Sequence, residues 1–392
     1  MFLYLSETPD PKKAHLSDAH AETIRATLAP VAANIETITR TFYSKMFAAH
    51  PELIADLFNR GNQKQGAQQK ALAASVATFA SQLVDESAPD PVMMLDRIAH
   101  KHVSLGVTRD QYQIVHDNLM AAIAEVLGDA VTPAVAEAWD AVYWLMADVL
   151  ISHEEALYAS DGVAAGDVFR TGTVTEKRQL TPTVTTYVLE GTFSEPRPGQ
   201  YTSVGVRLDD GARQLRQYSI VEGDASHYRI AVQTDGEVST FLRDRVEEGD
   251  TVDVTLAAGD LVLREGSNPV VLVSSGIGST PMLGILGHLA KHGDARRVTY
   301  IHSDDSEDTW AQAQDSRELV SSLADASIHL SFRDRDERVD ITEHDIAGAD
   351  VYLCGGPGFL QAIRDDIAAL PADHAPANVY YELFSPNDWL IN

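Results

Sequence analysis

Residues 270–289 read VVLVSSGIGSTPMLGILGHL, and this stretch decides the fold of the C-terminal half of the chain. Apolar residues of strand type lead into a glycine-rich turn, which opens an apolar segment of helical period. Gly276 and Gly278 permit close backbone approach, while Thr280 is expected to cap the helix and Pro281 to occupy its first turn. Free N–H groups at such a point suit a pyrophosphate. A plain strand-to-helix turn is the alternative, because Pro281 replaces the third glycine of the common dinucleotide fingerprint.

The segments around this stretch alternate between strand and helix from Asn268 onward. The strand-like runs are PVVLVSS, RVTYIHS, SIHLSF, DVYLCG and NVYYELF. This alternation predicts a doubly wound parallel sheet with its ligand beyond the carboxyl ends of the strands. The second strand ends in HSDDSED (302–308), whose acids can accept from a ribose 2′-hydroxyl and would repel a 2′-phosphate. The sequence therefore favours NADH over NADPH, with a simple acidic loop as the alternative.

The preceding segment, from Asp167, has a period of two. Six short β-rich runs separated by turn residues predict a small antiparallel barrel, interrupted by one helix at about Ser239–Arg245. RQYS (216–219) places Arg216 and Tyr218 on one face of a strand. Arg216 can neutralise a diphosphate and Tyr218 can contact a flavin. The alternative interpretation of this motif is an ordinary barrel strand with an exposed arginine.

Residues 16–158 have helical period throughout and predict an all-α domain, followed by a small-residue linker at 159–166. Within it, DRIAHKHVSLG (96–106) holds two histidines. Residues two apart on a helix point about 200° apart, so both histidines cannot reach one ligand. His102 shares a face with the apolar Ile98, and we therefore expect His100 at the surface.

Composition limits the partners. A formal charge of −28 argues against nucleic acid or an anionic membrane, and no apolar run reaches the roughly 18 residues of a membrane span. The single cysteine, Cys354, excludes an intrachain disulfide. The N-terminal MFLYLSETPDPKK is too short in its apolar part for a signal peptide, so we expect a cytoplasmic protein.

The C-terminal motifs resemble the ferredoxin-reductase-type FAD/NAD module. They are RPGQY (197–201), RQYS, GEVS (236–239), GIGSTPM (276–282), YLCGGPGF (352–359) and YYELFSP (380–386). The resemblance implies FAD held by Tyr201, Arg216, Gln217, Tyr218, Ser219, Gly236, Val238 and Ser239. It implies nicotinamide dinucleotide at Gly276, Gly278, Ser279, Thr280, Pro281 and Met282, with Cys354, Gly355 and Phe384 also at the cofactors. Two departures, the extra glycine in Gly355-Gly356-Pro357 and Ser385 in place of a glycine, affect loop geometry near the nicotinamide.

The helical part resembles the globin of flavohaemoglobins. The matching segments are FYSKMFAAHPEL (42–53), LFNRGNQKQGAQQKAL (57–72), KHVSLGVTRDQYQIV (101–115) and AWDAVYWLM (138–146). The resemblance, which runs from about residue 16 to Pro386, implies haem b with His102 as the proximal ligand. It also implies a distal side formed by Tyr43, Gln68 and Leu72, a haem-packing Phe58, and an imidazole-orienting pair, Tyr112 and Glu154. Lys101 and Glu382 match residues near the flavin–haem junction.

These resemblances imply a three-domain protein: an all-α globin (16–158), an antiparallel six-stranded FAD barrel (165–266) and an α/β doubly wound NAD domain (267–392). The implied activity is nitric oxide dioxygenation: NADH reduces FAD, FAD reduces the haem iron, and NO and O₂ become nitrate. The alternatives are an NADH-dependent reductase of flavins, ferric chelates or quinones with an accessory globin, and an oxygen-binding or sensing globin kept ferrous by its reductase. We expect a monomer whose partners are the small molecules NO, O₂ and NAD(P)H, with no nucleic acid and no membrane insertion.

Overall fold

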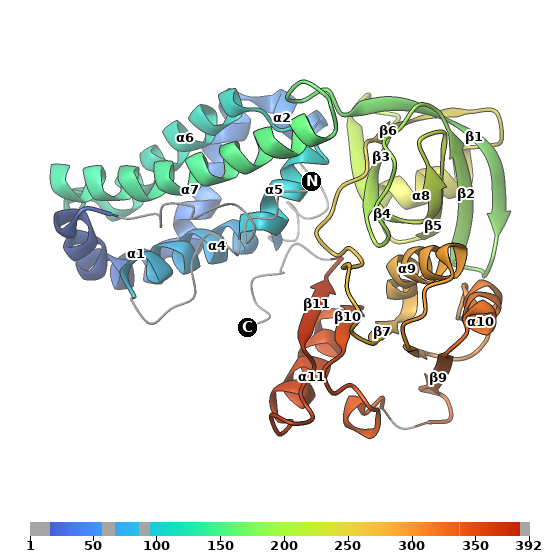
Figure 1. Ribbon diagram of the computed structural model, residues 1–392. Coiled ribbons are helices and arrows are strands. Elements are labelled where there is room, and N and C mark those ends of the chain that lie inside the picture. Colours follow the sequence, from blue (N-terminus) through green and yellow to red (C-terminus); the bar gives the residue numbers. More distant parts are fainter. Residues whose placement is uncertain (1–15, 57–66, 86–94, 337, 385–392) are drawn as a thin grey trace. The chain divides into compact units, whose positions relative to one another are not determined.

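The structure is a computed structural model that describes residues 16–56, 67–85, 95–336 and 338–384 (Figure 1). The described chain forms two compact units. One comprises the helical part up to Phe169 together with residues 207–215, and the other comprises the remainder from Arg170. Among the described residues, no helix combines the length and the apolar character needed to cross a membrane.

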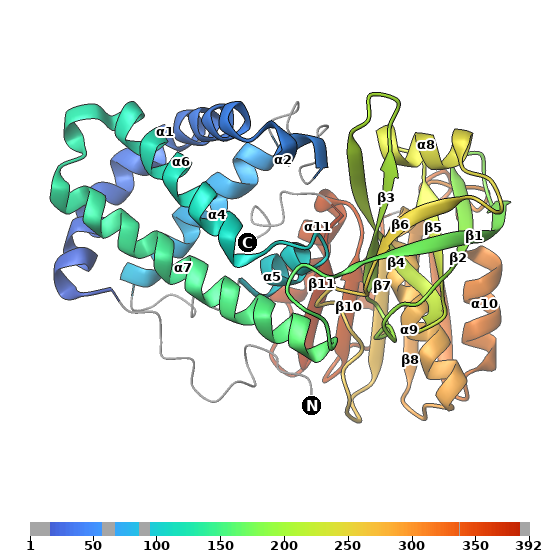
Figure 2. The same cartoon turned by 90° about the horizontal axis from the view of Figure 1, so that it is seen from above.

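The first unit is helical, as the period of 3.6 predicted. Its helices are α1 (Asp18–Ala49), α2 (Pro51–Asp56), α4 (Ala67–Val84), α5 (Leu95–Val103), α6 (Arg109–Leu127) and α7 (Pro133–Ser160). Helix α1 packs against α4, α6 and α7, while α5 packs against α7 (Figure 2). Ile24, Val31 and Ile38 of α1 are buried on one stripe, and each contributes about 1.5–3 kcal/mol by leaving water.

The second unit begins with a closed barrel of six strands in the order β1-β2-β5-β4-β3-β6. The strands are β1 (Phe169–Gln179), β2 (Val184–Glu190), β3 (Tyr201–Arg207), β4 (Arg213–Asp224), β5 (His227–Gln233) and β6 (Thr251–Thr255). The predicted six-stranded barrel is therefore confirmed. The interrupting helix α8 (Glu237–Arg245) starts two residues earlier than expected, because Gly236 at φ 94° already turns the chain into it.

The same unit continues into a five-stranded parallel sheet of order β11-β10-β7-β8-β9, as predicted. Its elements are β7 (Val270–Ser275), α9 (Ser279–His292), β8 (Val298–Asp304), α10 (Ala313–Ser322), β9 (Ala326–Phe332), β10 (Asp350–Cys354), α11 (Pro357–Ala368) and β11 (Asn378–Glu382). Alternate residues of β7 serve the two faces: Val270 and Leu272 pack with α9, and Val271 and Val273 with α11 (Figure 1). The strand order reverses between β7 and β10, which makes their carboxyl ends the expected ligand site.

Helix α9 packs closely on the barrel because Gly284 has no side chain. A Cβ there would lie 2.8 Å from the Ile220 carbonyl oxygen of β4 and 3.3 Å from the Gly199 nitrogen. An ion pair of 2.8 Å between Arg229 Nη1 and Asp315 Oδ2 adds a link between β5 and α10. These contacts place the RQYS strand beside the helix that follows the glycine-rich turn.

Candidate functional site

A buried polar triad joins three helices of the first unit. His102 in the last turn of α5 directs Nδ1 at Glu154 Oε1 of α7, 2.7 Å away, and at the Tyr112 hydroxyl of α6, 3.0 Å away. The Tyr112 hydroxyl donates to the same carboxylate oxygen at 2.5 Å. Glu154 is 2% exposed and Tyr112 7%. One buried carboxylate therefore accepts from both neighbours.

This geometry sets the protonation of the triad. Burial, together with the Glu154 charge, holds the pKa of Tyr112 well above its usual value, so Tyr112 stays a hydrogen-bond donor. The carboxylate favours a proton on His102 Nδ1, which leaves the lone pair on Nε2. No hydrogen bond to Nε2 is found within the described part of the chain, and the imidazole is 31% exposed. His102 is thus arranged to donate its Nε2 lone pair to a metal.

The turn between α5 and α6 positions the triad. The His102 carbonyl accepts from the N–H groups of Leu105 and Val107, both at 3.0 Å, and Gly106 adopts φ 72°. Thr108 then starts α6, where its N–H donates to Gln111 Oε1 at 2.9 Å in a capping box. The break between α5 and α6 therefore brings Tyr112 back beside His102.

Other residues assigned to the haem side by resemblance are described only in part. Tyr43 is 5% exposed in α1, with its ring 4.7 Å from that of Phe42. Leu72 of α4 and Lys101 of α5 are half-buried. Gln68 belongs to α4, but its side chain lies outside the described residues, as does the whole of Phe58.

The expectation that His100 lies at the surface is wrong. His100 is 7% exposed, because the face of α5 that carries it packs against α7. Its ring lies 6.0 Å from that of His153, edge to face, and its Nε2 is 3.7 Å from Asp96 Oδ1. The sequence reasoning overlooked Asp96 and His153. The spacing of four between Asp96 and His100 was the available signal, since it places both on one helix face.

Strand β4 carries the residues assigned to the flavin. Arg216, Gln217 and Tyr218 are half-buried, and Ser219 is buried. The Tyr218 hydroxyl is buried and has no hydrogen-bond partner within the described chain. Burial raises the pKa of Tyr218, so the hydroxyl remains a donor. A buried polar atom without a partner points to a ligand that accepts from it.

The start of α8 and the end of the barrel complete this region. Ser239 Oγ accepts from the Asp235 N–H at 2.7 Å and donates to the Gly236 carbonyl at 3.3 Å, which holds the turn before α8. Val238 is fully buried. Tyr201 at the start of β3 is 7% exposed and lies against Gly259, where a Cβ would come within 3.0 Å of its ring.

The two glycines of the turn after β7 have different roles. Gly276 adopts φ 54°, and a Cβ there would meet nothing within 4 Å, so the turn requires glycine while the space beside it is open. A Cβ on Gly278 would lie 2.4 Å from the Cys354 carbonyl oxygen. The close backbone approach expected at Gly278 is therefore an approach to the Cys354 carbonyl of β10.

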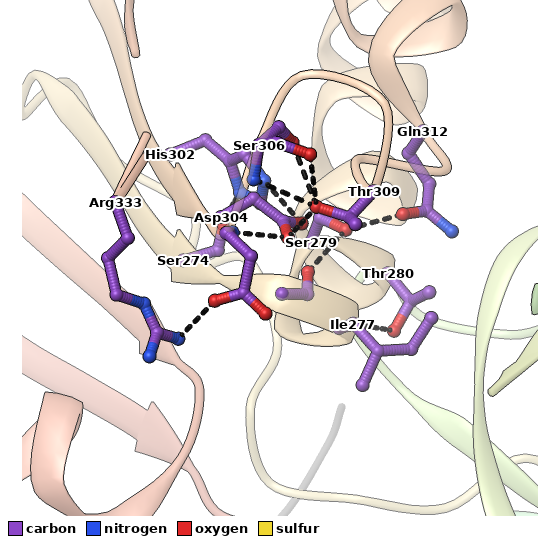
Figure 3. A network of polar contacts seen from close by, with 12 residues as sticks. Ser274, Ile277, Ser279, Thr280, His302, Asp304, Ser306, Thr309, Gln312 and Arg333 are labelled. Carbon is purple, nitrogen blue, oxygen red and sulfur yellow. Dashed lines mark hydrogen bonds and ion pairs between the residues drawn. The ribbon is translucent and has the colours of Figure 1, made fainter. Parts of the chain in front are cut away.

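The expectation that Thr280 caps α9 is also wrong. Gly278 has helical φ −62°, so the short turn Gly276–Gly278 runs directly into α9 at Ser279. Thr280 lies inside the first turn and donates to the Ile277 carbonyl at 2.8 Å. Ser279 donates to Gln312 Oε1 at 2.7 Å (Figure 3). Pro281 lies in the first turn as predicted, and both it and Met282 are buried.

The acidic loop after β8 forms an ordered polar network (Figure 3). Asp304 accepts from Thr309 Oγ1 at 2.6 Å and from the Asp305 N–H at 2.7 Å, and its Oδ2 is 3.5 Å from His302 Nε2. Burial acts to raise the pKa of Asp304, but these partners outweigh it and hold the pKa low. Asp305 pairs with Arg333 at 2.9 Å. The negative charge of the loop is therefore partly neutralised by Arg333. Asp304 itself has no arginine or lysine partner among the described ion pairs.

The ends of β10 and β11 lie side by side, with Cys354 paired in register with Glu382. Cys354 is fully buried, and a Cβ on Gly355 would come within 2.5 Å of Ser275 Oγ. Phe384 is 51% exposed. Ser385 lies outside the described residues. These residues gather at the carboxyl edge of the sheet, where the strand order reverses.

Comparisons with known proteins agree with this architecture. A globin family model matches residues 40–150. The flavohemoprotein of Deinococcus radiodurans is 38% identical over 93% of this chain and 96% of its own length, and that of Bacillus subtilis is 33% identical over 95% and 98%. The structure of a flavohemoglobin from Malassezia yamatoensis with bound FAD and haem superimposes with a TM-score of 0.89 at 34% identity, over 94% of this chain and 100% of that one. The FAD/NAD-binding domain of a Vibrio cholerae nitric oxide dioxygenase covers 55% of this chain and 98% of its own, at 32% identity and a TM-score of 0.50.

Proposed function

Because the chain belongs to the flavohemoprotein family, with a globin and an FAD/NAD reductase module in one polypeptide, we propose that it is an NADH-dependent nitric oxide dioxygenase. The triad of His102, Tyr112 and Glu154 carries this proposal. An oxidoreductase of this kind needs an electron-rich iron, and the triad is built to provide one.

The residues present fit haem b. His102 Nε2 would hold the iron, because Nδ1 already faces Glu154 at 2.7 Å. A buried carboxylate that accepts from the far imidazole nitrogen makes the ligand more electron-donating and fixes the plane of the ring. Tyr112 keeps the carboxylate oriented by donating to it. When bound, the haem supplies the iron at which O₂ and NO react.

The distal assignment follows the family resemblance. We assign Tyr43 as a hydrogen-bond donor to the diatomic ligand, with Gln68 as a second polar group, Leu72 as an apolar wall and Phe58 packing on the haem. Tyr43 is 5% exposed, which shields a hydroxyl at this position from bulk water. A desolvated donor stabilises developing negative charge more strongly than an exposed one.

The residues of the second unit fit FAD and a nicotinamide dinucleotide. Tyr218 would donate its unpaired hydroxyl to the flavin, with Arg216 at the diphosphate. The remaining flavin contacts are assigned to Tyr201, Gln217, Ser219, Gly236, Val238 and Ser239. Open space beside Gly276 suits a phosphate at the start of α9. When bound, these groups supply hydride and single-electron transfer.

Cys354, Gly355 and Phe384 are assigned to recognition of the nicotinamide end. The rest of the dinucleotide is assigned to the residues beside the turn glycines, which are Ser279, Thr280, Pro281 and Met282. Asp304 favours NADH over NADPH, because its low pKa keeps a charge that accepts from a ribose hydroxyl and repels a phosphate. Lys101 and Glu382 are assigned, by the family resemblance, to positions near the flavin–haem junction. We take 16–158, 165–266 and 267–392 as the haem, FAD and NAD domains.

The test is NO consumption by the purified holoprotein. We expect NO loss that requires both NADH and O₂ and yields nitrate. Tyr43→Phe should slow NO turnover, while NADH-driven reduction of ferricyanide should change little, because that acceptor does not need the distal side. Unchanged NO turnover in Tyr43→Phe, or NADH oxidation without nitrate, would favour a flavin, ferric or quinone reductase with an accessory globin.

A further inference from the structure

A second polar cluster lies between α5 and α7, apart from the His102 triad. Asp96 and His100 stand four residues apart on one face of α5, and His153 faces them from α7. His153 Nε2 lies 2.6 Å and His100 Nε2 3.7 Å from Asp96 Oδ1, and the three ligand atoms are all within 4.8 Å of one another. His100 and His153 are 7% and 5% exposed. None of these residues takes part in the proposed reaction.

The donor set is two imidazole nitrogens and one carboxylate oxygen, which suits Zn²⁺ and similar divalent transition metals. Bonds of about 2.0–2.2 Å in a tetrahedron put ligand atoms roughly 3.3–3.6 Å apart. The separation of 3.7 Å between His100 and Asp96 is already close to this value. The 2.6 Å contact between His153 and Asp96 would have to open by less than an ångström. Asp96, whose side chain is 19% exposed, leaves an edge through which a water can complete the coordination.

We propose that Asp96, His100 and His153 form a binding site for a divalent transition-metal ion, with Zn²⁺ as the ion to be used as a probe. The site is distinct from the iron site, because helix geometry turns His100 about 200° from His102 and His153 about 100° from Glu154. An ion there would tie α5 to α7 close to the His102–Glu154 pair, because His153 directly precedes Glu154 and His100 lies two residues before His102. It would therefore hold in place the two helices that carry the proximal hydrogen bond.

The test uses the full-length holoprotein after dialysis against a chelator. The protein is equilibrated with buffered free Zn²⁺, and zinc per haem is measured by mass spectrometry. His153→Gln should lose one equivalent of bound zinc, or weaken its affinity by at least about tenfold. The matched control is His292→Gln, which disrupts the surface pair His288/His292 on α9, whose ring centroids are 4.1 Å apart. The control should retain the equivalent that His153→Gln loses.

A second measurement covers the case in which His153→Gln fails to fold. Zn²⁺ should raise the unfolding temperature of the wild-type protein, because an ion that binds only the folded state stabilises it by mass action. Anomalous scattering at the zinc edge from zinc-soaked crystals should place an ion between Asp96, His100 and His153. Equal zinc content in wild type and His153→Gln, or anomalous maps with zinc only at surface histidines, would overturn the proposal and leave the cluster as a polar helix contact that binds no ion.

Discussion

Glu154→Gln is the change that tests the proximal triad most directly. The substitution keeps the shape of the side chain and removes its charge at a position that is 2% exposed. His102 Nδ1, 2.7 Å from Oε1, then donates to a neutral amide oxygen in place of a carboxylate. The imidazole becomes a weaker electron donor, and the oxidised iron loses more stabilisation than the reduced iron. The midpoint potential of the haem should therefore rise.

The size of the rise follows from the contact that changes. A hydrogen bond to a charged group is worth about 1.5–3 kcal/mol and a neutral one about 0.5–1.5 kcal/mol, so the difference is roughly 1–1.5 kcal/mol. For a one-electron couple, about 1.4 kcal/mol corresponds to 59 mV. Taking the whole difference as stabilisation of the oxidised state gives a rise of roughly 40–60 mV.

The assay is a spectroelectrochemical titration of the Soret band. Glu155→Gln is the matched control, because it removes the same charge at the next residue in sequence. The side chain of Glu155 is 53% exposed, and its Oε1 lies 3.4 Å from Arg109 Nε. Solvent screens that charge, so the control should shift the potential little. An unchanged or lowered potential in Glu154→Gln, or an equal rise in both variants, would refute the role assigned to the triad.

Three further changes test the rest of the chain. Tyr218→Phe should weaken FAD retention about tenfold, because the flavin loses the hydrogen bond proposed from the buried Tyr218 hydroxyl. Flavin fluorescence after ultrafiltration measures the retained FAD, and full retention would contradict the assignment. Gly278→Ala should destabilise the protein by about 1–3 kcal/mol, because its Cβ would collide with the Cys354 carbonyl, whereas Gly358→Ala on α11 meets nothing within 4 Å and should not; thermal unfolding compares the two. Burial lowers the pKa of His302, so the contribution of the neutral imidazole to stability is present above the unfolded-state pKa of about 6.5 and is lost as the pH falls below that value. His302→Asn should therefore flatten the fall of the urea midpoint between pH 7 and pH 5. An unchanged pH profile would argue against a buried neutral histidine.

The architecture could be predicted from sequence because each part has its own hydrophobic period. The stripe from Ile24 to Met46, the period of two from Asp167 and the alternation from Asn268 each correspond to a region of the structure. The local chemistry of the turns was less predictable. Whether Thr280 or Gly278 starts a helix depends on backbone angles that residue type alone does not fix. The role of Gly278 depends on Cys354, a residue far away in the sequence.

The candidate site was predictable only where a family motif existed. Periodicity alone would not have selected His102 or paired it with Glu154, which lies 52 residues later. The error over His100 has a simple physical cause. The expectation was one buried face for α5, the face of His102, whereas the face that carries Asp96 and His100 also packs against α7, where His153 Nε2 lies 2.6 Å from Asp96 Oδ1. The spacing of Asp96 and His100 shows that they share a face of α5, but nothing in the sequence of α5 identifies His153 of α7 as the residue that faces them.

The contact between α5 and α7 explains why so short a helix carries so many polar residues. Helix α5 has nine residues, and isolated helices of that length are marginal in water, so tertiary contacts must hold it in place. Its contact with α7 includes one hydrogen bond, from His102 to Glu154 at 2.7 Å, and one close polar approach, of His153 Nε2 to Asp96 Oδ1 at 2.6 Å. A slip of α5 by one residue along α7 would rotate its side chains by about 100° and break both contacts at once. Leaving a buried donor or acceptor unpaired costs about 1–3 kcal/mol, so the His102–Glu154 hydrogen bond selects one register where apolar packing alone would tolerate neighbouring ones. The same selection fixes the direction of the His102 imidazole, which makes the polarity of this helix contact a requirement of the proposed iron site.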